Sequence, residues 1–304
     1  MHDIIVIGGG PAGLTAALYA KRSGKSVLVL EKEGYGGQIA FSPRVENYPG
    51  IPVISGEELA ENMLDQILNL DVDTDVATVT AVEKTHEGYR LLTEDGESHD
   101  CRAVILAAGV KHRHLGLPGE LELIGQGISF CAVCDGGFYQ DRDVAVVGGG
   151  DTALQDALFL ANSCRHVTLI HRRDEFRGEQ RLVEQVEKRE NISILYSHVV
   201  EELRSENGEL SAIVVKDLKS GESKTMALAG LFAAVGQAPQ SAPFAQLVAT
   251  QGGYYDAGED CCSNAEGVFV AGDGRVKTVR QLTTAVGDGA VAGLAACKYV
   301  DSLS

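Results

Sequence analysis

Short apolar runs that end in glycines recur along the chain and predict buried parallel strands followed by tight turns. The first run, Ile4–Ile7, leads through glycines into a helical stretch from Leu14 to about Arg22. The next apolar run, Val27–Leu30, ends at Glu31. This order predicts a complete β-α-β unit at the start of the chain.

A second β-α-β unit is predicted in the middle of the chain. Val144–Val147 and Val167–Ile170 read as strands, and Leu154–Asn162 between them reads as a helix. Glu57–Leu70 has one apolar stripe and predicts an amphipathic helix, and another helix is expected to end near Tyr299. Further strands are expected at 77–82, 89–92, 103–106, 195–196, 212–215, 230–235 and 267–271. The fold class is therefore α/β.

The first β-α-β unit carries a G-x-G-x-x-G fingerprint at its first turn. Gly8 permits the tight turn, Gly10 lets a pyrophosphate approach the backbone, and Gly13 allows close packing of helix on strand. The helix N-terminus offers free N–H groups to phosphates. Glu31, at the end of the second strand, is placed to accept hydrogen bonds from a ribose. These features predict a dinucleotide site.

The second unit repeats the fingerprint with Gly148, Gly150 and Ala153 in the three glycine positions. Counted from the first glycine, the position that Glu31 holds in the first unit is held here by His171. Three arginines follow, Arg172, Arg173 and Arg177. The absent acid and the added guanidinium groups favour a 2′-phosphate, so this site is expected to prefer NADPH over NADH.

One Cys-x-x-Cys, formed by Cys131 and Cys134, lies between the two fingerprints. Two thiols at this spacing can close into a disulfide and reopen, and Asp135 directly after them can exchange a proton. A zinc site would need a second cysteine pair at ligand spacing, which the sequence lacks, so no metal is expected.

Composition narrows the function classes further. The chain has 43 acidic and 26 basic residues and a formal net charge of −17, which argues against nucleic-acid binding. The apolar run 226–235 is too short to span a membrane, and the start of the chain has no signal-peptide pattern. Five cysteines outside the Cys-x-x-Cys have no framework spacing, which is typical of a reducing cytoplasm.

Taken together, the motifs resemble those of the low-molecular-weight, bacterial-type thioredoxin reductase family, in the FAD/NADPH pyridine nucleotide-disulfide oxidoreductases. The resemblance covers nearly the whole chain. Its segments are Gly8–Gly13 with Glu31, Gly36–Gln38 with Val45–Gly50, Cys131–Asp135, Gly148–Ala153, His171–Arg177, and Gly272–Asp273 with Arg280–Gln281.

The resemblance implies two Rossmann-like dinucleotide-binding domains, with the NADPH domain inserted into the FAD domain. The expected boundaries are 1–113 with 244–304 for FAD and 114–243 for NADPH. It implies a homodimer that reduces thioredoxin. The charge and the short apolar runs predict neither a nucleic-acid nor a membrane partner. Electrons would pass from NADPH to FAD, to the disulfide and to thioredoxin. Cys134 would face the flavin, Cys131 would attack the partner, and Asp135 would be the acid–base group.

Cofactor contacts are expected, from the fingerprints and the resemblance, along both dinucleotide sites. The expected positions are Gly8, Gly10, Pro11, Ala12, Gly13, Glu31, Gly37, Gln38, Asn47, Gly109, Gly148, Gly150, Asp151, Thr152, Ala153, His171, Arg172, Arg173, Arg177, Gly272, Asp273, Arg280, Gln281 and Leu282.

The chain departs from the family pattern at Val133, at 42–44 and at Gly274. None of these positions is a redox group, so they concern partner preference more than reaction type. Two alternatives stay open: a flavin dithiol enzyme with another partner, either a dithiol oxidase or a ferredoxin-fed reductase, and a nucleotide-binding scaffold with a structural disulfide. The vicinal pair Cys261 and Cys262 has no assigned role.

Overall fold

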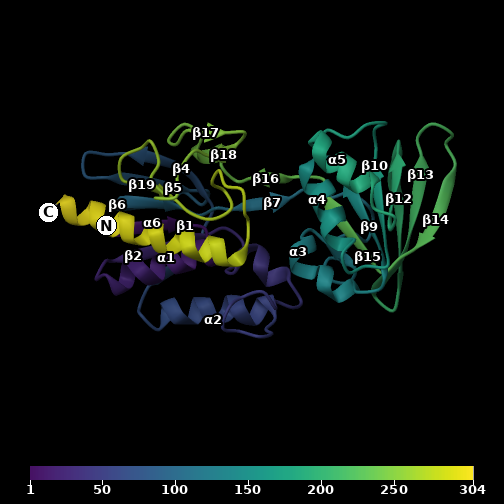
Figure 1. Ribbon diagram of the computed structural model, residues 1–304. Helices are drawn as coiled ribbons and strands as arrows, with labels where there is room; N and C mark the ends of the chain where they lie inside the picture. The colour runs from purple at the N-terminus through teal and green to yellow at the C-terminus, as the bar shows by residue number, and fades with distance from the viewer. Residues whose placement is uncertain (304) are drawn as a thin grey trace. The chain divides into compact units, whose positions relative to one another are not determined.

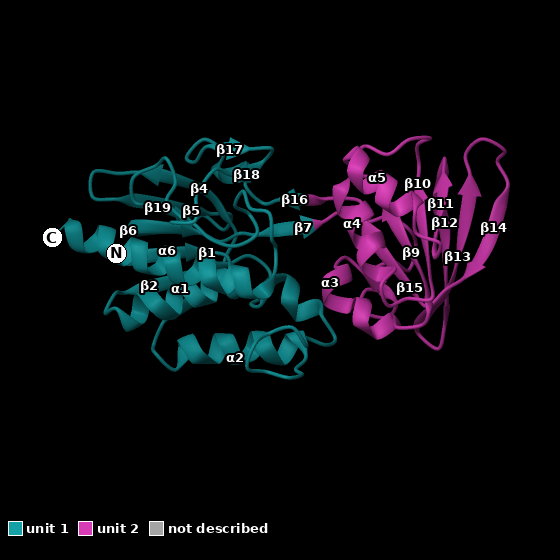
Figure 2. Cartoon of the chain, in the orientation of Figure 1, with its two compact units in different colours: residues 1–111, 238–304 teal, residues 112–237 magenta. Residues whose placement is uncertain are grey.

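The computed structural model describes residues 1–303 and divides the chain into two compact units (Figure 2). The first unit comprises residues 1–111 and 238–304, and the second comprises residues 112–237. The chain passes between them at β7, Val110–His112, and at β16, Gln237–Pro239, which pair with each other. The second unit is thus inserted into the first.

The first unit is built on a seven-stranded sheet in the order β3-β2-β1-β6-β5-β4, with β19 paired to β6. Strands β3, β2, β1, β6 and β19 are parallel to their neighbours, whereas β4 and β5 add antiparallel pairs. The bounds are β1 His2–Ile7, β2 Val27–Glu31, β3 Asp73–Val76, β4 Val79–Lys84, β5 Tyr89–Thr93, β6 Ser98–Leu106 and β19 Val268–Val270. A hairpin, β17 Thr250–Gln251 with β18 Tyr254–Tyr255, follows the short 3-10 helix η3 Ala242–Phe244.

Both faces of this sheet are buried. Ile4 and Val6 of β1 belong to one hydrophobic cluster, while Ile5 and Ile7 belong to a second. Because successive side chains of a strand point to opposite faces, an unbroken apolar run is what a strand covered on both sides requires.

Three α-helices belong to the first unit: α1 Pro11–Arg22, α2 Gly56–Leu68 and α6 Leu282–Ser302 (Figure 1). Helix α6 packs closely on α1 through glycines. A Cβ added at Gly289 would lie 2.2 Å from the carbonyl oxygen of Ala12, and one at Gly293 would lie 2.7 Å from that of Ala16. The small residues therefore let the two helix backbones approach each other.

The second unit has a five-stranded parallel sheet in the order β11-β10-β9-β15-β8. Its strands are β8 Ile128–Ser129, β9 Asp143–Gly148, β10 His166–His171, β11 Ile192–Tyr196 and β15 Gly230–Ala234. An antiparallel sheet of β12 His198–Glu206, β13 Glu209–Asp217 and β14 Ser223–Ala227 belongs to the same unit. The helices are α3 Ala132–Asp135, α4 Asp151–Leu160 and α5 Gln180–Glu187, with the 3-10 helix η2 Gly136–Tyr139.

The predicted α/β class and both β-α-β units are confirmed, with differences at the ends of elements. Helix α1 begins at Pro11, a turn earlier than predicted. Elements without a predicted counterpart include β3, the strands β12 and β14 of the antiparallel sheet, the polar helix α5, and the single turn α3 that carries the Cys-x-x-Cys. The segment 35–50, predicted as loop, contains the 3-10 helix η1, Gly37–Phe41.

The sequence pattern hides α5 because only Leu182, Val183 and Val186 of its eight residues are buried.

Across residues 1–303, no helix combines the length and the apolar character needed to span a bilayer.

Candidate functional site

The Cys-x-x-Cys lies in the second unit as a closed disulfide. The sulfur atoms of Cys131 and Cys134 are 2.04 Å apart. Cys131 precedes α3 as its N-cap, and its sulfur accepts a hydrogen bond from the backbone N–H of Cys134 at 3.2 Å. Cys134 and the neighbouring Val133 are exposed. A disulfide in this setting is open to exchange with another thiol or disulfide.

Asp135, the last residue of α3, is held by one oxygen and free at the other. The hydroxyl of Ser129 donates to its Oδ2 at 2.6 Å, whereas its Oδ1 is buried and has no hydrogen-bond partner among residues 1–303. Burial raises the pKa of this carboxyl, and the hydrogen bond from Ser129 only partly offsets that rise. A carboxyl with a raised pKa is suited to proton exchange at neutral pH.

The first fingerprint forms a glycine cradle where β1 meets α1. A Cβ at Gly8, which has φ +111°, would lie 2.3 Å from the carbonyl oxygen of Ala107. A Cβ at Gly13 would lie 1.9 Å from the carbonyl oxygen of Gly8. Glu31 closes the turn, because its Oε2 accepts the backbone N–H of Gly9 at 2.6 Å.

Helix α1 begins in a way that leaves its first N–H groups to a ligand. Its N-cap is Gly10, which provides no side-chain hydrogen bond, and Pro11 occupies the first turn. By contrast, α2 is capped by the Ser55 hydroxyl, which accepts from the N–H of Glu58 at 3.1 Å. An uncapped N-terminus of a long helix offers donors and a positive dipole end to a phosphate.

Other predicted positions of the first unit lie around this cradle. A Cβ at Gly37 would lie 3.2 Å from the Cα of Gly10, and a Cβ at Gly272 would lie 2.9 Å from the Cβ of Ala12. Gln38 follows in η1. The structure therefore brings segments 8–13, 37–38 and 272–273 together.

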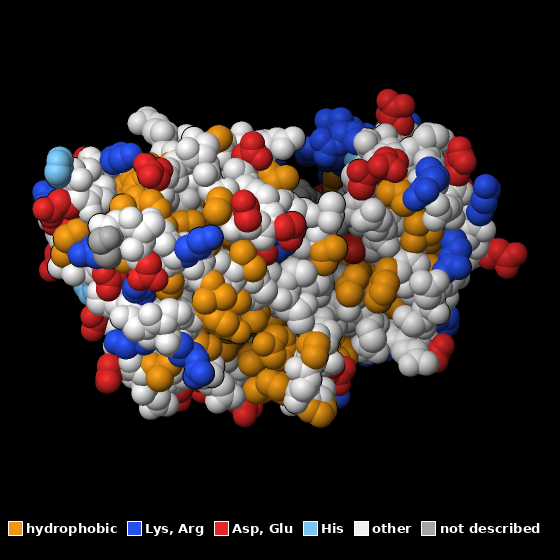
Figure 3. Space-filling view, turned by 60° about the vertical axis from the view of Figure 1, so that its left-hand side comes forward, with side chains coloured by type: hydrophobic (Ala, Val, Ile, Leu, Met, Phe, Trp, Pro, Cys, Tyr) orange, Lys and Arg blue, Asp and Glu red, His pale blue; other side chains and the backbone are white. Residues whose placement is uncertain are grey.

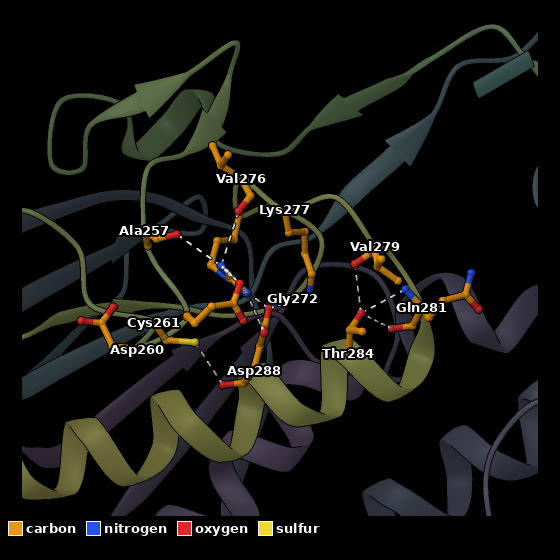
Figure 4. Close-up of polar contacts among 12 residues, drawn as sticks. Ala257, Asp260, Cys261, Gly272, Val276, Lys277, Val279, Gln281, Thr284 and Asp288 are labelled. Carbon is orange, nitrogen blue, oxygen red and sulfur yellow. Dashed lines mark hydrogen bonds and ion pairs between the residues drawn. The ribbon is translucent and has the colours of Figure 1, made fainter. Parts of the chain in front are cut away.

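The loop before α6 links the remaining positions. The side chain of Asn47 donates to the Gln281 side chain at 3.4 Å, and Arg280 Nε donates to the carbonyl oxygen of Asp273 at 3.3 Å. Gln281 and Thr284 form a capping box at the start of α6, directly before Leu282 (Figure 4). Gly109 adopts φ +63°, and its carbonyl oxygen accepts the backbone N–H of Gln240 at 3.1 Å. A Cβ added at Gly274, directly after Asp273, would lie 3.3 Å from the same oxygen, so Gly109 lies next to the Gly272–Asp273 turn.

The carboxylate of Asp273 is suited to binding a polar group. Its Oδ1 is buried without a hydrogen-bond partner among residues 1–303. Burial raises the pKa of its carboxyl, against the opposing charges of Lys277 and Arg280. A buried oxygen without a partner is costly unless a bound group supplies a hydroxyl, as the sugar-like chain of a flavin does. The residues present fit a flavin dinucleotide.

A buried ion-pair network, which the sequence did not reveal, supports the Gly272–Asp273 turn. Asp288 of α6 accepts hydrogen bonds from Arg275 at 3.0 Å, from Lys277 at 2.8 Å and from the backbone N–H of Gly272 at 3.0 Å (Figure 4). The side chains of Arg275, Lys277 and Asp288 are 2%, 6% and 8% exposed.

The charge on Asp288 is kept by its partners. Burial by itself would raise the pKa of this carboxyl, but hydrogen bonds from Arg275 and Lys277 hold it below its usual value. The network thus joins the turn that carries Asp273 to the long helix α6. No spacing rule connects these positions, and only the recurrence of acidic and basic residues near a Gly-Asp turn could have suggested them.

The second fingerprint also leads into an uncapped helix, but its turn differs, because Gly8 has a positive φ and Gly148 does not. Helix α4 begins after Gly150, again without a side-chain cap, and Thr152 of its first turn is exposed. Ala153 replaces the third glycine, and its Cβ packs 2.7 Å from where a Cβ of Gly148 would stand. Asp151 Oδ1 accepts the backbone N–H of Glu179 at 2.7 Å, which fastens the following loop to the helix.

The arginines predicted to contact a 2′-phosphate lie beside this second fingerprint. The backbone N–H of Arg177 donates to the carbonyl oxygen of Gly149 at 2.8 Å. Arg172, Arg173 and Arg177 are exposed, whereas His171 is buried, with its ring against Gly149 and its Nε2 3.0 Å from the carbonyl oxygen of Glu175. His171 therefore shapes the turn, and the guanidinium groups face solvent.

The remaining cysteines take no part in a disulfide. Cys101, Cys164, Cys261 and Cys297 are buried, and Cys262 is exposed. The thiol of Cys261 lies 3.5 Å from the carbonyl oxygen of Asp288, which places it beside the buried network.

The whole chain, and not only its motifs, resembles known proteins. A family model described as pyridine nucleotide-disulphide oxidoreductase matches residues 2–289. The chain is 37% identical over 304 residues to a thioredoxin reductase of Bacillus subtilis strain 168, covering 100% of this chain and 96% of that protein. It is 38% identical over 303 residues to one of Treponema pallidum strain Nichols, covering 99% and 98%. The crystal structure of thioredoxin reductase from Streptococcus pyogenes MGAS5005 matches it with a TM-score of 0.95 at 38% identity, covering 99% of each chain.

Proposed function

The chain belongs to the pyridine nucleotide-disulphide oxidoreductase family, and on that premise we propose that it is an NADPH-dependent thioredoxin-disulfide reductase. The observation that carries the proposal is the Cys131–Cys134 disulfide, exposed at Cys134 and next to Asp135, in a chain with two uncapped fingerprint helices. Together they provide two dinucleotide sites and a thiol pair, which is what transfer of electrons from a nucleotide to a disulfide requires.

We assign FAD to the first unit and NADPH to the second. In the first unit, the Gly8–Gly13 cradle and the α1 N-terminus would hold the pyrophosphate, and Glu31 would accept from a ribose. Asp273 would accept from a hydroxyl of the flavin chain with its unpartnered Oδ1. When bound, the flavin supplies the step between hydride and sulfur that side chains do not perform alone.

In the second unit, the N-terminus of α4 would hold the NADPH pyrophosphate. Arg172, Arg173 and Arg177 would bind the 2′-phosphate, because guanidinium groups bind phosphates in a bidentate manner and remain charged at all relevant pH values. This arrangement favours NADPH over NADH.

The protein's own residues then exchange the disulfide with thioredoxin. In the reduced pair, the Cys131 thiolate attacks one sulfur of the oxidised partner, whose disulfide breaks as a mixed disulfide forms. The Cys134 thiolate then attacks Cys131, which re-forms the internal disulfide and releases the second sulfur of the partner. The pair loses two electrons and two protons, and the partner gains both. Asp135 takes and returns a proton during these steps.

We further propose that the enzyme is a cytoplasmic homodimer. The five cysteines outside the disulfide suit a reducing compartment. Hydrophobic side chains gather on the face drawn in Figure 3, and the first unit exposes Tyr19 of α1 together with Val291 and Leu294 of α6. Exposed large apolar side chains on packed helices are typical of a subunit interface.

The exchange of Cys131 for serine tests the reaction. NADPH should still bleach the flavin of Cys131→Ser, because that step does not use the disulfide, but the variant should not reduce thioredoxin. The control is Cys262→Ser, which removes an exposed thiol outside the pair and should keep full activity. Full thioredoxin reduction by Cys131→Ser would refute the proposal. Flavin that bleaches with ferredoxin but not with NADPH would instead identify a reductase with another electron donor.

A further inference from the structure

Ser129, the last residue of β8, connects the two parts of the redox motif. Its side chain is 5% exposed, and β8 is fixed to the sheet by pairing with β15, where Ser129 lies opposite Phe232. The Ser129 oxygen accepts the backbone N–H of Cys131 at 3.0 Å, and its hydroxyl lies 2.6 Å from Asp135 Oδ2. One buried hydroxyl thus contacts both Cys131 and Asp135.

The distances determine where the Ser129 proton points. A hydroxyl donates one hydrogen, and its two candidate acceptors are Asp135 Oδ2 at 2.6 Å and the carbonyl oxygen of Cys131 at 3.4 Å. The carboxylate is nearer and carries charge, so it receives the hydrogen bond. The N–H of Cys131 fills a lone pair of the same oxygen, which fixes the orientation of the hydroxyl.

This contact makes the two oxygens of Asp135 unequal. Oδ2 is bound to Ser129, while Oδ1 is buried and has no partner among residues 1–303. The other titratable side chain whose charge couples to Asp135 is Tyr139, and burial raises its pKa to about 12. Tyr139 therefore stays neutral, and Oδ1 is the oxygen left to exchange a proton.

We propose that Ser129 is a positioning residue, which turns the Asp135 carboxyl so that Oδ1 can exchange a proton with the cysteine sulfurs. The inference rests on the proposed thiol–disulfide exchange. In that exchange, Asp135 takes the proton from the attacking thiol of the pair and gives it to the departing sulfur of the partner. Ser129 moves no proton itself. It contributes the orientation and a hydrogen bond that favours the ionised carboxylate.

Removal of the hydroxyl in Ser129→Ala tests this role. We expect the kcat for thioredoxin reduction to fall about tenfold, as for loss of one hydrogen bond to a charged group. Loss of the donor also raises the pKa of Asp135, so the fall in kcat at high pH should move to higher pH. The rate of flavin reduction by NADPH should not change. Thr168→Val is the matched control, because it removes another buried hydroxyl, on β10, from the same sheet.

A double-variant comparison separates positioning from general destabilisation. In an Asp135→Asn background, Ser129→Ala should cause no further loss of kcat, because the group that Ser129 orients is already inactive. An equal tenfold loss in that background would overturn the inference, as would a Ser129→Ala enzyme with the wild-type kcat and pH profile. If Ser129→Ala does not fold, Ser129→Cys takes its place in the test. A thiol is a weak hydrogen-bond donor, so this variant should shift the pH profile of kcat in the same direction.

A second readout distinguishes failure of this inference from failure of the proposed function. The rate at which iodoacetamide alkylates the dithiothreitol-reduced pair, followed against pH, needs neither NADPH nor thioredoxin. A wild-type protein that does not reduce thioredoxin, with an alkylation profile that shifts in Ser129→Ala, would refute the function and retain the positioning role. Active wild-type enzyme with the same alkylation profile in Ser129→Ala and in Thr168→Val would refute the positioning role alone.

Discussion

At the scale of single residues, Asp288 shows how a buried charge can serve a site that it does not enter. Its carboxylate contacts the side chains of Arg275 and Lys277 and the N–H of Gly272. The side chains of Asp288, Arg275 and Lys277 are all largely buried. A buried ion pair adds little net stability over apolar packing, but removing one partner leaves an uncompensated charge. The network therefore specifies the position of the Gly272–Asp273 turn more than it stabilises the fold.

We predict that Asp288→Asn lowers both stability and flavin content. The neutral amide leaves Arg275 and Lys277 without a buried counter-charge, so the free energy of unfolding should fall by about 3 kcal/mol. Denaturant unfolding and the ratio of flavin to protein absorbance measure the two effects. The control is Glu259→Gln, which removes a partner of the same Arg275 whose side chain is 91% exposed. Equal effects in both variants would contradict the prediction.

At the scale of elements, the two fingerprint helices begin in the same way but differ at the third position of the fingerprint. Both α1 and α4 follow a glycine N-cap without a side-chain hydrogen bond. In α1 the third position must be Gly13, because a Cβ there would lie 1.9 Å from the carbonyl oxygen of Gly8. In α4 the corresponding Ala153 is tolerated. The turn of the first unit is therefore the tighter of the two.

The arginines after β10 give a prediction about nucleotide choice. Replacing Arg172, Arg173 and Arg177 together by Gln should lower kcat/KM for NADPH about 100-fold, because charge-assisted bonds to the 2′-phosphate are lost. The value for NADH, which lacks that phosphate, should change little. Steady-state assays with both nucleotides measure this. Arg204→Gln, an exposed arginine of β12 paired with Glu202, should leave both values unchanged. An equal loss for NADH would contradict the assigned phosphate site.

At the scale of the whole molecule, one chain builds two units, each with its own central sheet and hydrophobic core. The chain crosses between them only at β7 and β16. The helices α1 and α6 cover the sheet of the first unit, and their outer side chains remain exposed. We expect this surface to form the contact between two copies of the chain.

An acidic residue on α6 should therefore separate the proposed dimer. Leu294 is 50% exposed, and Leu294→Asp would bury a charge in the subunit contact, which costs more than the contact gains. Sedimentation should give a dimer for the wild type and a monomer for the variant. Leu218→Asp is the control, because Leu218 is 51% exposed but lies after β13 in the second unit. A variant that remains dimeric would contradict this interface.

The sequence alone determined the α/β class, the two β-α-β units and the position of the redox pair. These features depend on local patterns in the sequence: an unbroken apolar run, which predicts a strand buried on both faces, a glycine turn, and two cysteines one helical turn apart. Element ends and the helix α5 were less predictable, since tertiary contacts decide where a short polar helix begins and ends.

Only the tertiary structure decided how residues far apart in sequence meet. Asp288 reaches the N–H of Gly272, and Glu31 reaches that of Gly9. The bond from Ser129 to Asp135 spans only six residues, but it depends on β8 being fixed by β15. Such contacts leave no periodic signal, because their geometry is set by the packing of whole elements. The physical reason is that a buried polar atom must find a partner, and the fold determines which partner is near.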